Sequence, residues 1–318
     1  MVDTTEKVTL RQLQIFLAAV EHRSFWRAAA QLELSPPAVS MQMAKLSEAL
    51  GSTLFEKDGR SIQLTAAATA LIPYAERMTE ALHEAQGVLS ALQGRLNGLV
   101  RVAMVTTSRN FGPHLLQEFR RRHPDVLIES IIANREGVIK RLEANQIDIA
   151  LMGRPPQRLE VEALPFAKHP YVLIGHPLNA LAKRKLISRR ELSHQPFFVR
   201  EEGSGTRMVH ENYFLSERLQ LPNASMMDSN ENIKQAVMAD MGIAFISAHT
   251  VALELQAKKL AILAADGMPT MREWFVLHLK RKKLSPAAQS FKAFVRDQGP
   301  ALMRRLFGML EKKKAGGS

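Results

Sequence analysis

In the first fifty residues, hydrophobic positions recur with helical spacing in three short segments. Thr9 can cap a helix that runs to Glu21, because apolar residues recur there at steps of three and four. Ser24 can cap a second, shorter helix that is rich in alanine. Ser35 stands before two prolines, which suit a first helical turn, and the third helix then ends at Gly51. The pattern predicts three helices joined by tight turns.

The third predicted helix has one apolar face and one face of small and polar residues. Its apolar positions are Val39, Met43, Leu46 and Leu50. Residues 53–65 then read as two strands with a turn at 57–60. A helix whose polar face and N-terminal end are exposed can enter a DNA major groove, which is about 12 Å wide. Periodicity alone favours the alternative, an ordinary three-helix bundle.

Residues 66–92 form one long predicted helix with the hydrophobic spacing of a coiled coil. Apolar residues recur at alternating steps of four and three: Leu71, Ala75, Met78, Leu82, Ala85, Leu89 and Leu92. A helix buried within its own chain would give the same pattern. Its position directly after the three-helix segment favours dimerisation, since two symmetric DNA readers can bind two half-sites. We expect Pro73 to kink this helix, and Gly94, Asn97 and Gly98 mark a hinge after it.

Beyond residue 98 the pattern changes to short apolar runs that alternate with amphipathic helices. Predicted strands lie at 99–105, 126–132, 147–152, 172–174, 197–199 and 243–247. This alternation predicts a doubly wound α/β fold. Such sheets bind ligands beyond the carboxyl ends of their strands, where loops meet helix N-termini.

Three loops of this region carry residue types that bind an anion. The loop 200–207 has glycines that allow close backbone approach, hydroxyls at Ser204 and Thr206, and an arginine at each end. The loop 228–232 introduces another helix, and Arg154 follows a predicted strand. A glycine-rich turn with solvated arginines is the alternative for 200–207, and simple solvent exposure is the alternative for Arg154.

Composition restricts the chemistry of the protein. The chain has 318 residues, too many for one ordinary hydrophobic core, and its 46% hydrophobic and 23% charged residues are typical of a globular protein. It has no cysteine, which excludes disulfides, thiolate catalysis and cysteine-bound metal. We expect no metal site. Because no signal peptide and no membrane-spanning run is recognisable, we expect a cytoplasmic protein without membrane association.

The net charge of +12 suggests a polyanionic partner but does not locate a DNA site. Residues 1–95 hold three Lys and six Arg against two Asp and eight Glu, so 9 − 10 gives −1. The positive excess lies downstream, in runs such as 120–122, 183–185, 280–283 and 312–314. Runs of this kind are more typical of solvated faces or tails than of dedicated contacts.

The spaced positions of residues 13–65 resemble the DNA-binding domain of LysR-type transcriptional regulators. The shared positions are Phe16, Ser24, Ala28-Ala29, Leu32, Ser35, Pro37-Ala38-Val39-Ser40, Leu46, Leu50-Gly51, Leu54-Phe55 and Leu64-Thr65. The resemblance implies a winged helix-turn-helix whose recognition helix and wing contact DNA through Ser35, Pro37, Ser40, Met41, Gln42, Lys45, Lys57 and Arg60. The chain departs from the family at Pro36, where Gln is frequent, and at Met41, where many members have Arg. Both departures remove polar donors and favour apolar contact with thymine methyl groups.

Residues 98–300 resemble the two-lobed, periplasmic-binding-protein-like effector domain of the same family. The resemblance implies that the chain crosses between the lobes near 163–166 and 264–270, with an effector between them. Segments 152–156, 203–207 and 229–238 are similar to the regulators of carbon-fixation (RuBisCO) operons, a subgroup that responds to phosphorylated metabolites. The implied effector contacts are Thr107, Ser108, Asn134, Arg135, Arg154, Arg200, Ser204, Thr206, Arg207 and Asn230.

Four parts of the chain are expected from these patterns and resemblances. Residues 1–65 form a winged helix-turn-helix, and residues 66–97 form a linker helix and hinge. Residues 98–300 form the effector domain, with lobe I at 98–164 and 268–300 and lobe II at 165–267. Residues 301–318 form a basic C-terminal tail without an assigned role.

The sequence thus predicts a LysR-type regulator of carbon-fixation genes whose promoter binding responds to a small anionic, phosphorylated metabolite. Expected partners are double-stranded promoter DNA, further copies of the chain in a dimer or tetramer, and RNA polymerase. We expect no cofactor other than the effector. The first alternative is a regulator of another metabolic operon with a non-phosphorylated effector.

Two remote alternatives use the same α/β fold. A solute-binding transport protein would have no use for the predicted DNA-binding segment 35–51. An enzyme would need a nucleophile, a base and oxyanion donors in one site, and Ser204, His210 and Glu202 within one helical segment do not assemble them. No Gly-x-Ser-x-Gly, Walker-type or His-Glu-x-x-His pattern occurs.

Overall fold

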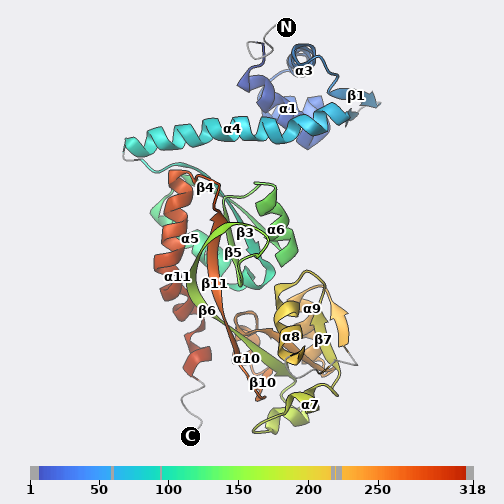
Figure 1. Ribbon diagram of the computed structural model, residues 1–318, viewed down its shortest axis with the longest axis vertical. Coiled ribbons are helices and arrows are strands. Elements are labelled where there is room, and N and C mark those ends of the chain that lie inside the picture. Colours follow the sequence, from blue (N-terminus) through green and yellow to red (C-terminus); the bar gives the residue numbers. More distant parts are fainter. Residues whose placement is uncertain (1–6, 59–60, 94, 216–218, 220–223, 313–318) are drawn as a thin grey trace. The chain divides into compact units, whose positions relative to one another are not determined.

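The computed structural model describes residues 7–58, 61–93, 95–215, 219 and 224–312 (Figure 1). The chain divides into two compact units, Met1–Leu92 and Gln93–Ser318. The first unit contains the predicted helix-turn-helix, wing and long helix, and the second contains the predicted effector domain. Two units agree with a chain that is too long for one core.

The N-terminal unit contains three short helices, a hairpin and one long helix: α1 (Leu10–His22), α2 (Phe25–Gln31), α3 (Pro36–Leu50), β1 (Phe55–Asp58), β2 (Ser61–Leu64) and α4 (Ala66–Leu92). The three predicted helix caps are confirmed, because the side chains of Thr9, Ser24 and Ser35 each accept a hydrogen bond from an amide of the first helical turn. Gly51 ends α3 with a φ of 63°, in the left-handed region that glycine adopts without strain.

The predicted apolar stripes of the three short helices meet in one core. Phe16 is fully buried, and its ring centroid lies 5.6 Å from that of Phe55 in the wing. Ala28 and Ala29 are buried on α2, where their small side chains allow close packing. Leu46 brings α3 into the same cluster, so packing fixes the orientation of this helix and of its exposed face.

Helix α4 has two halves with different surroundings, and Pro73 lies inside it without ending it. In the first half Ala68 and Ala75 are buried in the N-terminal core, and Leu71 packs against that core. Large apolar residues of the second half are exposed: Met78, Leu82, Val88, Leu89 and Leu92. Burial within the same chain therefore explains the apolar spacing of the first half. The second half leaves its apolar stripe exposed, as a dimerisation helix would.

The C-terminal unit is built on a nine-stranded mixed sheet. Its strands are β3 (Gly98–Val105), β4 (Val126–Ala133), β5 (Ile149–Met152), β6 (Val161–Gly175), β7 (Phe197–Arg200), β8 (Ala224–Met227), β9 (Ile243–Ser247), β10 (Ala261–Leu263) and β11 (Thr270–Leu279). Its helices are α5 (Gly112–Arg122), α6 (Arg135–Glu143), α7 (Arg189–Leu192), α8 (Gly205–Leu215), α9 (Asn230–Met238), α10 (Ala252–Gln256) and α11 (Pro286–Lys312), with short 3-10 turns η2 (Thr106–Asn110), η3 (Ala180–Lys183) and η4 (Ala248–Thr250). Strand β3 pairs in parallel with β4 and β5, and β7 pairs in parallel with β8 and β9. The predicted doubly wound α/β fold is confirmed.

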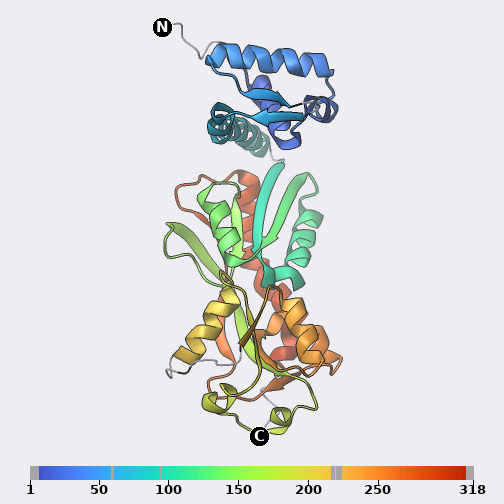
Figure 2. The ribbon, with the colours of Figure 1, turned by 90° about the vertical axis from the view of Figure 1, so that its right-hand side faces the viewer.

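The sheet is shared between two lobes, which Figure 2 shows one above the other. Lobe I carries β3, β4 and β5, and lobe II carries β7, β8, β9 and β10. The long strands β6 and β11 run antiparallel from one lobe to the other (Figure 1). Strand β11 pairs with β5 at 275–277 in lobe I, and β6 pairs with β9 at 171–174 in lobe II.

The second crossing lies later in the chain than the sequence suggested. We expected it at 264–270, but residues 261–263 form β10, and the carbonyl of Ala264 accepts a hydrogen bond from Ile187 within lobe II. The chain therefore passes to lobe I through β11, and its return to lobe I begins near residue 275 rather than 268. The first crossing, expected near 163–166, does lie in β6.

Helix α11 corrects the predicted C-terminal tail. The expected boundary at residue 301 is wrong, because α11 runs through Pro300 and ends at Lys312. Leu302, Met303 and Phe307 of this extension are buried in the core of the C-terminal unit. The run of basic residues suggested a solvated tail, but the apolar residues between them make the segment one face of a packed helix. Residues 313–318 lie outside the described part of the chain.

Candidate effector site and DNA-binding surface

A small cavity lies between the two lobes, beyond the carboxyl ends of β3, β5 and β7. Its walls come from both lobes and from the crossing strand β6: Val105, Thr106, Thr107, Arg135, Gly153, Arg154, His169, Tyr171, Ser204, Gly205, Thr206, Met208 and Val209. Five of the ten predicted effector contacts are among them: Thr107, Arg135, Arg154, Ser204 and Thr206. The loops around 154 and 200–207 therefore face one space, as expected for strand ends of a doubly wound sheet.

The cavity is small. Its volume is about 30 Å³, which is enough for about one or two water molecules. The amide of Glu136 in lobe I donates to the carbonyl of Gly203 in lobe II at 3.2 Å. The side chain of Asn110 donates to the carbonyl of His249 at 2.9 Å. These contacts hold the lobes together and leave no room for a metabolite.

Two arginines of lobe I give the cavity a positive charge. Arg135 begins α6 and donates to the backbone carbonyls of Arg154 and Pro155, neither of which carries a negative charge. Arg154 is exposed, and no side chain of the described residues forms an ion pair with it. Burial and the neighbouring charge of Arg154 lower the pKa of the Arg135 guanidinium. The nearby Glu136 carboxylate offsets part of this charge, but it is paired with Arg158 at 3.0 Å, so an anion would still stabilise the two adjacent cations.

Lobe II contributes a helix N-terminus to the same cavity. Helix α8 begins at Gly205, and the first amides of a helix have no acceptor within it. Ser204 and Thr206 are buried and bring hydroxyl groups to this end. Thr206 Oγ1 has no hydrogen bond of acceptable geometry, although the Tyr171 hydroxyl lies beside it. Free amides, hydroxyls and the positive end of the helix dipole together favour an anionic ligand.

Arg200 is buried and does not line the cavity. Its guanidinium donates to both carboxylate oxygens of Glu201, at 2.7 and 2.9 Å, and to Asn230 Oδ1 at 2.5 Å. It also donates to Thr106 Oγ1 in lobe I at 3.4 Å. The charge of Arg200 is therefore neutralised by Glu201, and the side chain joins three loops rather than facing a ligand in this closed arrangement.

Four further predicted contacts have structural roles around the cavity and do not line it. Ser108 Oγ donates to the carbonyl at the end of β3 at 2.7 Å. Asn134 caps α6 by accepting a hydrogen bond from an amide of its first turn at 2.9 Å. Arg207 donates to a glutamate one turn later in α8 at 2.7 Å. Asn230 accepts its hydrogen bond from Arg200.

His169 and Tyr171 line the cavity and were not predicted from the sequence. His169 is buried, its Nε2 lies 2.9 Å from Ser247 Oγ, and its Nδ1 has no hydrogen-bond partner. Burial lowers the pKa of His169 and raises that of Tyr171, so both side chains are neutral at pH 7. A Cβ on Gly153 would lie 2.8 Å from His169 Nδ1, so the glycine allows the ring to reach the cavity. The two residues share one face of β6 because strand residues alternate sides, a signal that a longer predicted strand would have provided.

The predicted DNA-binding residues of α3 lie on its exposed face. Ser35, Pro37, Ser40, Met41 and Lys45 are exposed, and Gln42 is half-buried. Val39, Met43 and Leu46 point into the core instead. The exposed face starts at the helix N-terminus, where free amides can bind a phosphate. Lys57 lies in β1, but its side chain and all of Arg60 lie outside what the structure describes.

The described residues contain no group of three or more His, Asp or Glu residues arranged to hold a metal ion. None of the helices in this part of the chain has both the length and the apolar composition to cross a bilayer.

Family models match both units of the chain. The model of the bacterial regulatory helix-turn-helix protein, lysR family, matches residues 10–69, and the model of the LysR substrate binding domain matches residues 93–300. A RuBisCO operon transcriptional regulator of Allochromatium vinosum is 38% identical over 299 residues, which cover 94% of this chain and 99% of that regulator. The HTH-type transcriptional regulator CfxR of Cupriavidus necator is 40% identical over 303 residues, which cover 95% and 96% of the two chains.

Solved structures of similar proteins share the fold. The regulatory domain of Synechocystis CcmR in complex with 2-PG is 32% identical, with a TM-score of 0.58, and covers 64% of this chain and 99% of that domain. Full-length CbnR complexed with its target DNA is 22% identical, with a TM-score of 0.67 over 91% of this chain and 99% of that chain, so the likeness is one of fold. With both domains matched along their length, the chain belongs to the LysR family of bacterial transcriptional regulators.

Proposed function

We propose that this regulator controls a carbon-fixation operon and that a small phosphorylated metabolite, bound between the lobes, changes its binding to promoter DNA. The observation that carries the proposal is the meeting of Arg135, Arg154 and the N-terminus of α8 at one cavity. Two relatives at 38% identity are RuBisCO operon transcriptional regulators, and the related CcmR regulatory domain is solved in complex with 2-PG. These relationships support 2-phosphoglycolate as the first effector to test. The proposal needs no cofactor besides the effector.

The small size of the cavity makes lobe opening part of the mechanism. A space of about 30 Å³ does not admit a phosphorylated metabolite, so the lobes must separate before it binds. Opening breaks the hydrogen bond from Glu136 to Gly203 and the contact of Arg200 with Thr106. The effector then stabilises whichever lobe arrangement places its phosphate between Arg135, Arg154 and α8. Binding of this kind shifts an existing equilibrium between lobe arrangements.

The second half of α4 supports a dimer. Its large apolar side chains are exposed in the single chain, and Leu92 is 80% exposed. Burying this stripe against a second copy would pair two winged helix-turn-helix units on two half-sites of a promoter. We therefore propose that the protein acts in the cytoplasm as a dimer or tetramer and contacts RNA polymerase there.

Calorimetric titration of the full-length protein tests the effector. We expect saturable binding of 2-phosphoglycolate and much weaker binding of glycolate, because only the phosphate can engage both arginines and the helix N-terminus. Equal affinity for the two ligands would contradict a phosphorylated effector and favour a regulator with a non-phosphorylated one. Absence of preference for carbon-fixation promoter DNA over competitor DNA in a mobility-shift assay would contradict the proposed target.

A further inference from the structure

A second and much larger cavity lies on the opposite face of the crossing strand β6. Between residues 168 and 172 the side chains alternate between the two cavities: His169 and Tyr171 face the inter-lobe cavity, whereas Lys168, Pro170 and Val172 line the larger one. The volume of the larger cavity is about 940 Å³. This volume lies within the range of about 300–1,000 Å³ that is typical of small-molecule sites.

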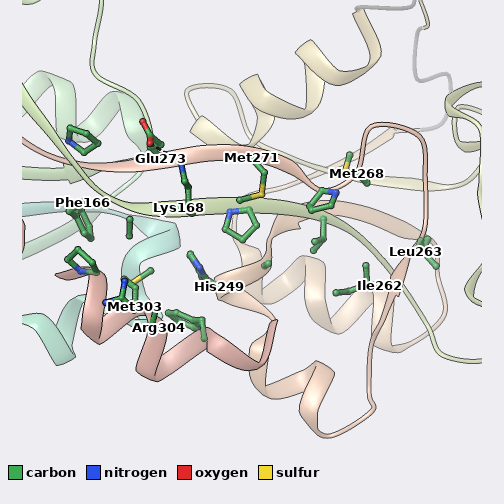
Figure 3. Close-up of a pocket in the computed structure, with 18 of the residues that line it drawn as sticks. Phe166, Lys168, His249, Ile262, Leu263, Met268, Met271, Glu273, Met303 and Arg304 are labelled. Carbon is green, nitrogen blue, oxygen red and sulfur yellow. Dashed lines mark hydrogen bonds and ion pairs between the residues drawn. The ribbon is translucent and has the colours of Figure 1, made fainter. Parts of the chain in front are cut away.

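The walls of this cavity are mostly apolar and come from separate elements (Figure 3). Phe166 and Met271 stand on the crossing strands, Ile262 and Leu263 on β10, and Met303 on α11. Met268 also lines the cavity, and the flexible side chains of the three methionines can adapt to the shape of a ligand. A concave space of this composition fits the apolar body of a small molecule better than the flat face of a protein.

The polar groups of the cavity are few and leave one positive charge unpaired. Lys168 Nζ lies 3.2 Å from Glu273 Oε1, so these two charges neutralise each other. Arg304 of α11 is exposed at the cavity, and no carboxylate of the described residues forms an ion pair with it. The cavity therefore has an excess of one cation, which is complementary to a single anionic group.

His249 adds a neutral hydrogen-bond donor to the same cavity. The indole Nε1 of Trp274 donates to His249 Nδ1 at 3.1 Å, so a neutral His249 ring carries its proton on Nε2. Burial lowers the pKa of His249 to about 3, which keeps the ring neutral at pH 7. The ring centroid of His249 lies 4.4 Å from that of Phe307, which is one helical turn after Arg304. Within the described residues no acceptor forms a hydrogen bond with His249 Nε2.

We propose that this cavity binds a small organic acid with an apolar body, separately from the inter-lobe effector. The carboxylate binds the Arg304 guanidinium and accepts the hydrogen bond of His249 Nε2. The apolar body lies between the crossing strands and α11, against Phe166, Met271 and Met303. This inference goes beyond the proposed function, because its residues take no part in phosphate binding.

Trp274 lies between the two cavities and reports on the larger one. Its ring stacks on His169 with centroids 4.0 Å apart, while its indole nitrogen bonds to His249. The chain has 2 tryptophans, and the other, Trp26, is 69% exposed in the N-terminal unit. A full-length Trp26→Phe protein therefore has a single buried fluorophore, whose emission responds when the hydrogen bonding of His249 changes.

Decanoate titrated into the Trp26→Phe protein tests the proposal. We expect a saturable change in Trp274 emission, and 1-decanol, which has no charge, should bind at least tenfold more weakly. In the same background Arg304→Ala should weaken decanoate binding about 10- to 30-fold, the loss of one hydrogen bond to a charged group that is partly screened by solvent. Arg305→Ala is the matched control, because Arg305 is the adjacent exposed arginine, pairs with Glu118 and does not line the cavity.

A second variant fills the space without removing a polar group. Ala264 is exposed at the cavity, so Ala264→Phe should abolish the decanoate response while leaving the fold intact. A response that is unchanged in both Arg304→Ala and Ala264→Phe, or equal affinity for decanol, would overturn the proposal. Emission that depends on protein concentration without decanoate would also overturn it, because a second copy of the chain would then cover the cavity. Binding of 2-phosphoglycolate is measured on the same samples, so failure of the inter-lobe proposal is detected independently.

Discussion

Replacing Arg154 with alanine tests the inter-lobe site with little risk to the fold. Arg154 lines the cavity, is exposed, and has no ion-pair partner among the described residues. The neighbouring Arg135 is held by backbone carbonyls and keeps its place when Arg154 is removed. The substitution therefore removes one positive charge from the site and changes little else.

The expected magnitude follows from the loss of one charge-assisted hydrogen bond. Such a bond contributes about 1.5–3 kcal/mol when it is well formed. Because Arg154 is exposed and partly screened by solvent, the lower end applies, about 1.5–2 kcal/mol. This loss corresponds to an increase of about 10- to 30-fold in the Kd of a phosphorylated effector. Removing Arg154 also relieves its repulsion of Arg135, which limits the loss further.

Calorimetric titration with 2-phosphoglycolate measures the change in Kd directly. Arg184→Ala serves as the control, because Arg184 is exposed in lobe II and pairs with Glu191 away from the cavity. The control should bind the effector as the unmodified protein does. If Arg154→Ala binds 2-phosphoglycolate with unchanged affinity, the paired arginines do not form the phosphate site and the reasoning is refuted.

Four further substitutions test Arg200, His210, the exposed stripe of α4 and the DNA-binding face of α3. Arg200→Ala leaves the Glu201 carboxylate and Asn230 without their donor, so thermal denaturation should show a loss of about 3–5 kcal/mol of stability; an unchanged melting temperature would contradict the role of Arg200 as a structural link. Burial lowers the pKa of His210 to about 4, so between pH 6.5 and 4 this residue binds more protons in the unfolded chain than in the folded one, and stability falls as pH decreases through this range. In denaturant titrations, His210→Phe should reduce by about 1 kcal/mol the difference in unfolding free energy between pH 7.5 and 5.5. An identical pH dependence in this variant would exclude His210 as its source. Leu89→Glu places a charge on the exposed stripe of α4 and should lower the oligomeric state in sedimentation experiments, whereas Gln86→Glu, an equal change of charge, should have less effect. Lys45→Ala should weaken binding to all DNA sequences and reduce the slope of log K against log salt by about 1, and an unchanged slope would remove Lys45 from the DNA contacts.

The short-range features of the N-terminal unit could be predicted from sequence because their causes lie within a few residues. Thr9, Ser24 and Ser35 cap the helices that follow them, and Gly51 adopts the backbone conformation that ends α3. These interactions depend on local chemistry alone. The same holds for the strand and helix alternation that identified the α/β fold.

The features that the sequence did not predict depend on long-range packing. In the sequence, Arg200 looks like an arginine that is free to bind an anion. In the folded protein its hydrogen bonds go to Glu201, Asn230 and Thr106, and folding brings Asn230 and Thr106 to it from distant parts of the chain. His169 lies in a strand of 15 residues, of which the sequence indicated only 172–174. Polar and apolar positions do not alternate along a strand that is buried in one lobe and crosses to another, so its full length carries no periodic signal.

The prediction of a tail from residue 301 was wrong for a related reason. The basic residues after Pro300 suggested a solvated tail, and proline normally interrupts a helix. The buried Phe307 packs against His249, which is far away in the sequence. Tertiary contact therefore decided the structure of a segment whose composition indicated a tail.

Regulation of DNA binding by the inter-lobe site can be measured by fluorescence anisotropy of a labelled carbon-fixation promoter fragment, titrated with full-length protein with and without 2-phosphoglycolate. We expect the effector to change the affinity of the unmodified protein for the promoter, and this change should need a higher effector concentration in Arg154→Ala. Tight promoter binding that is identical with and without the effector at saturating concentration would contradict the claim that the inter-lobe site regulates DNA binding.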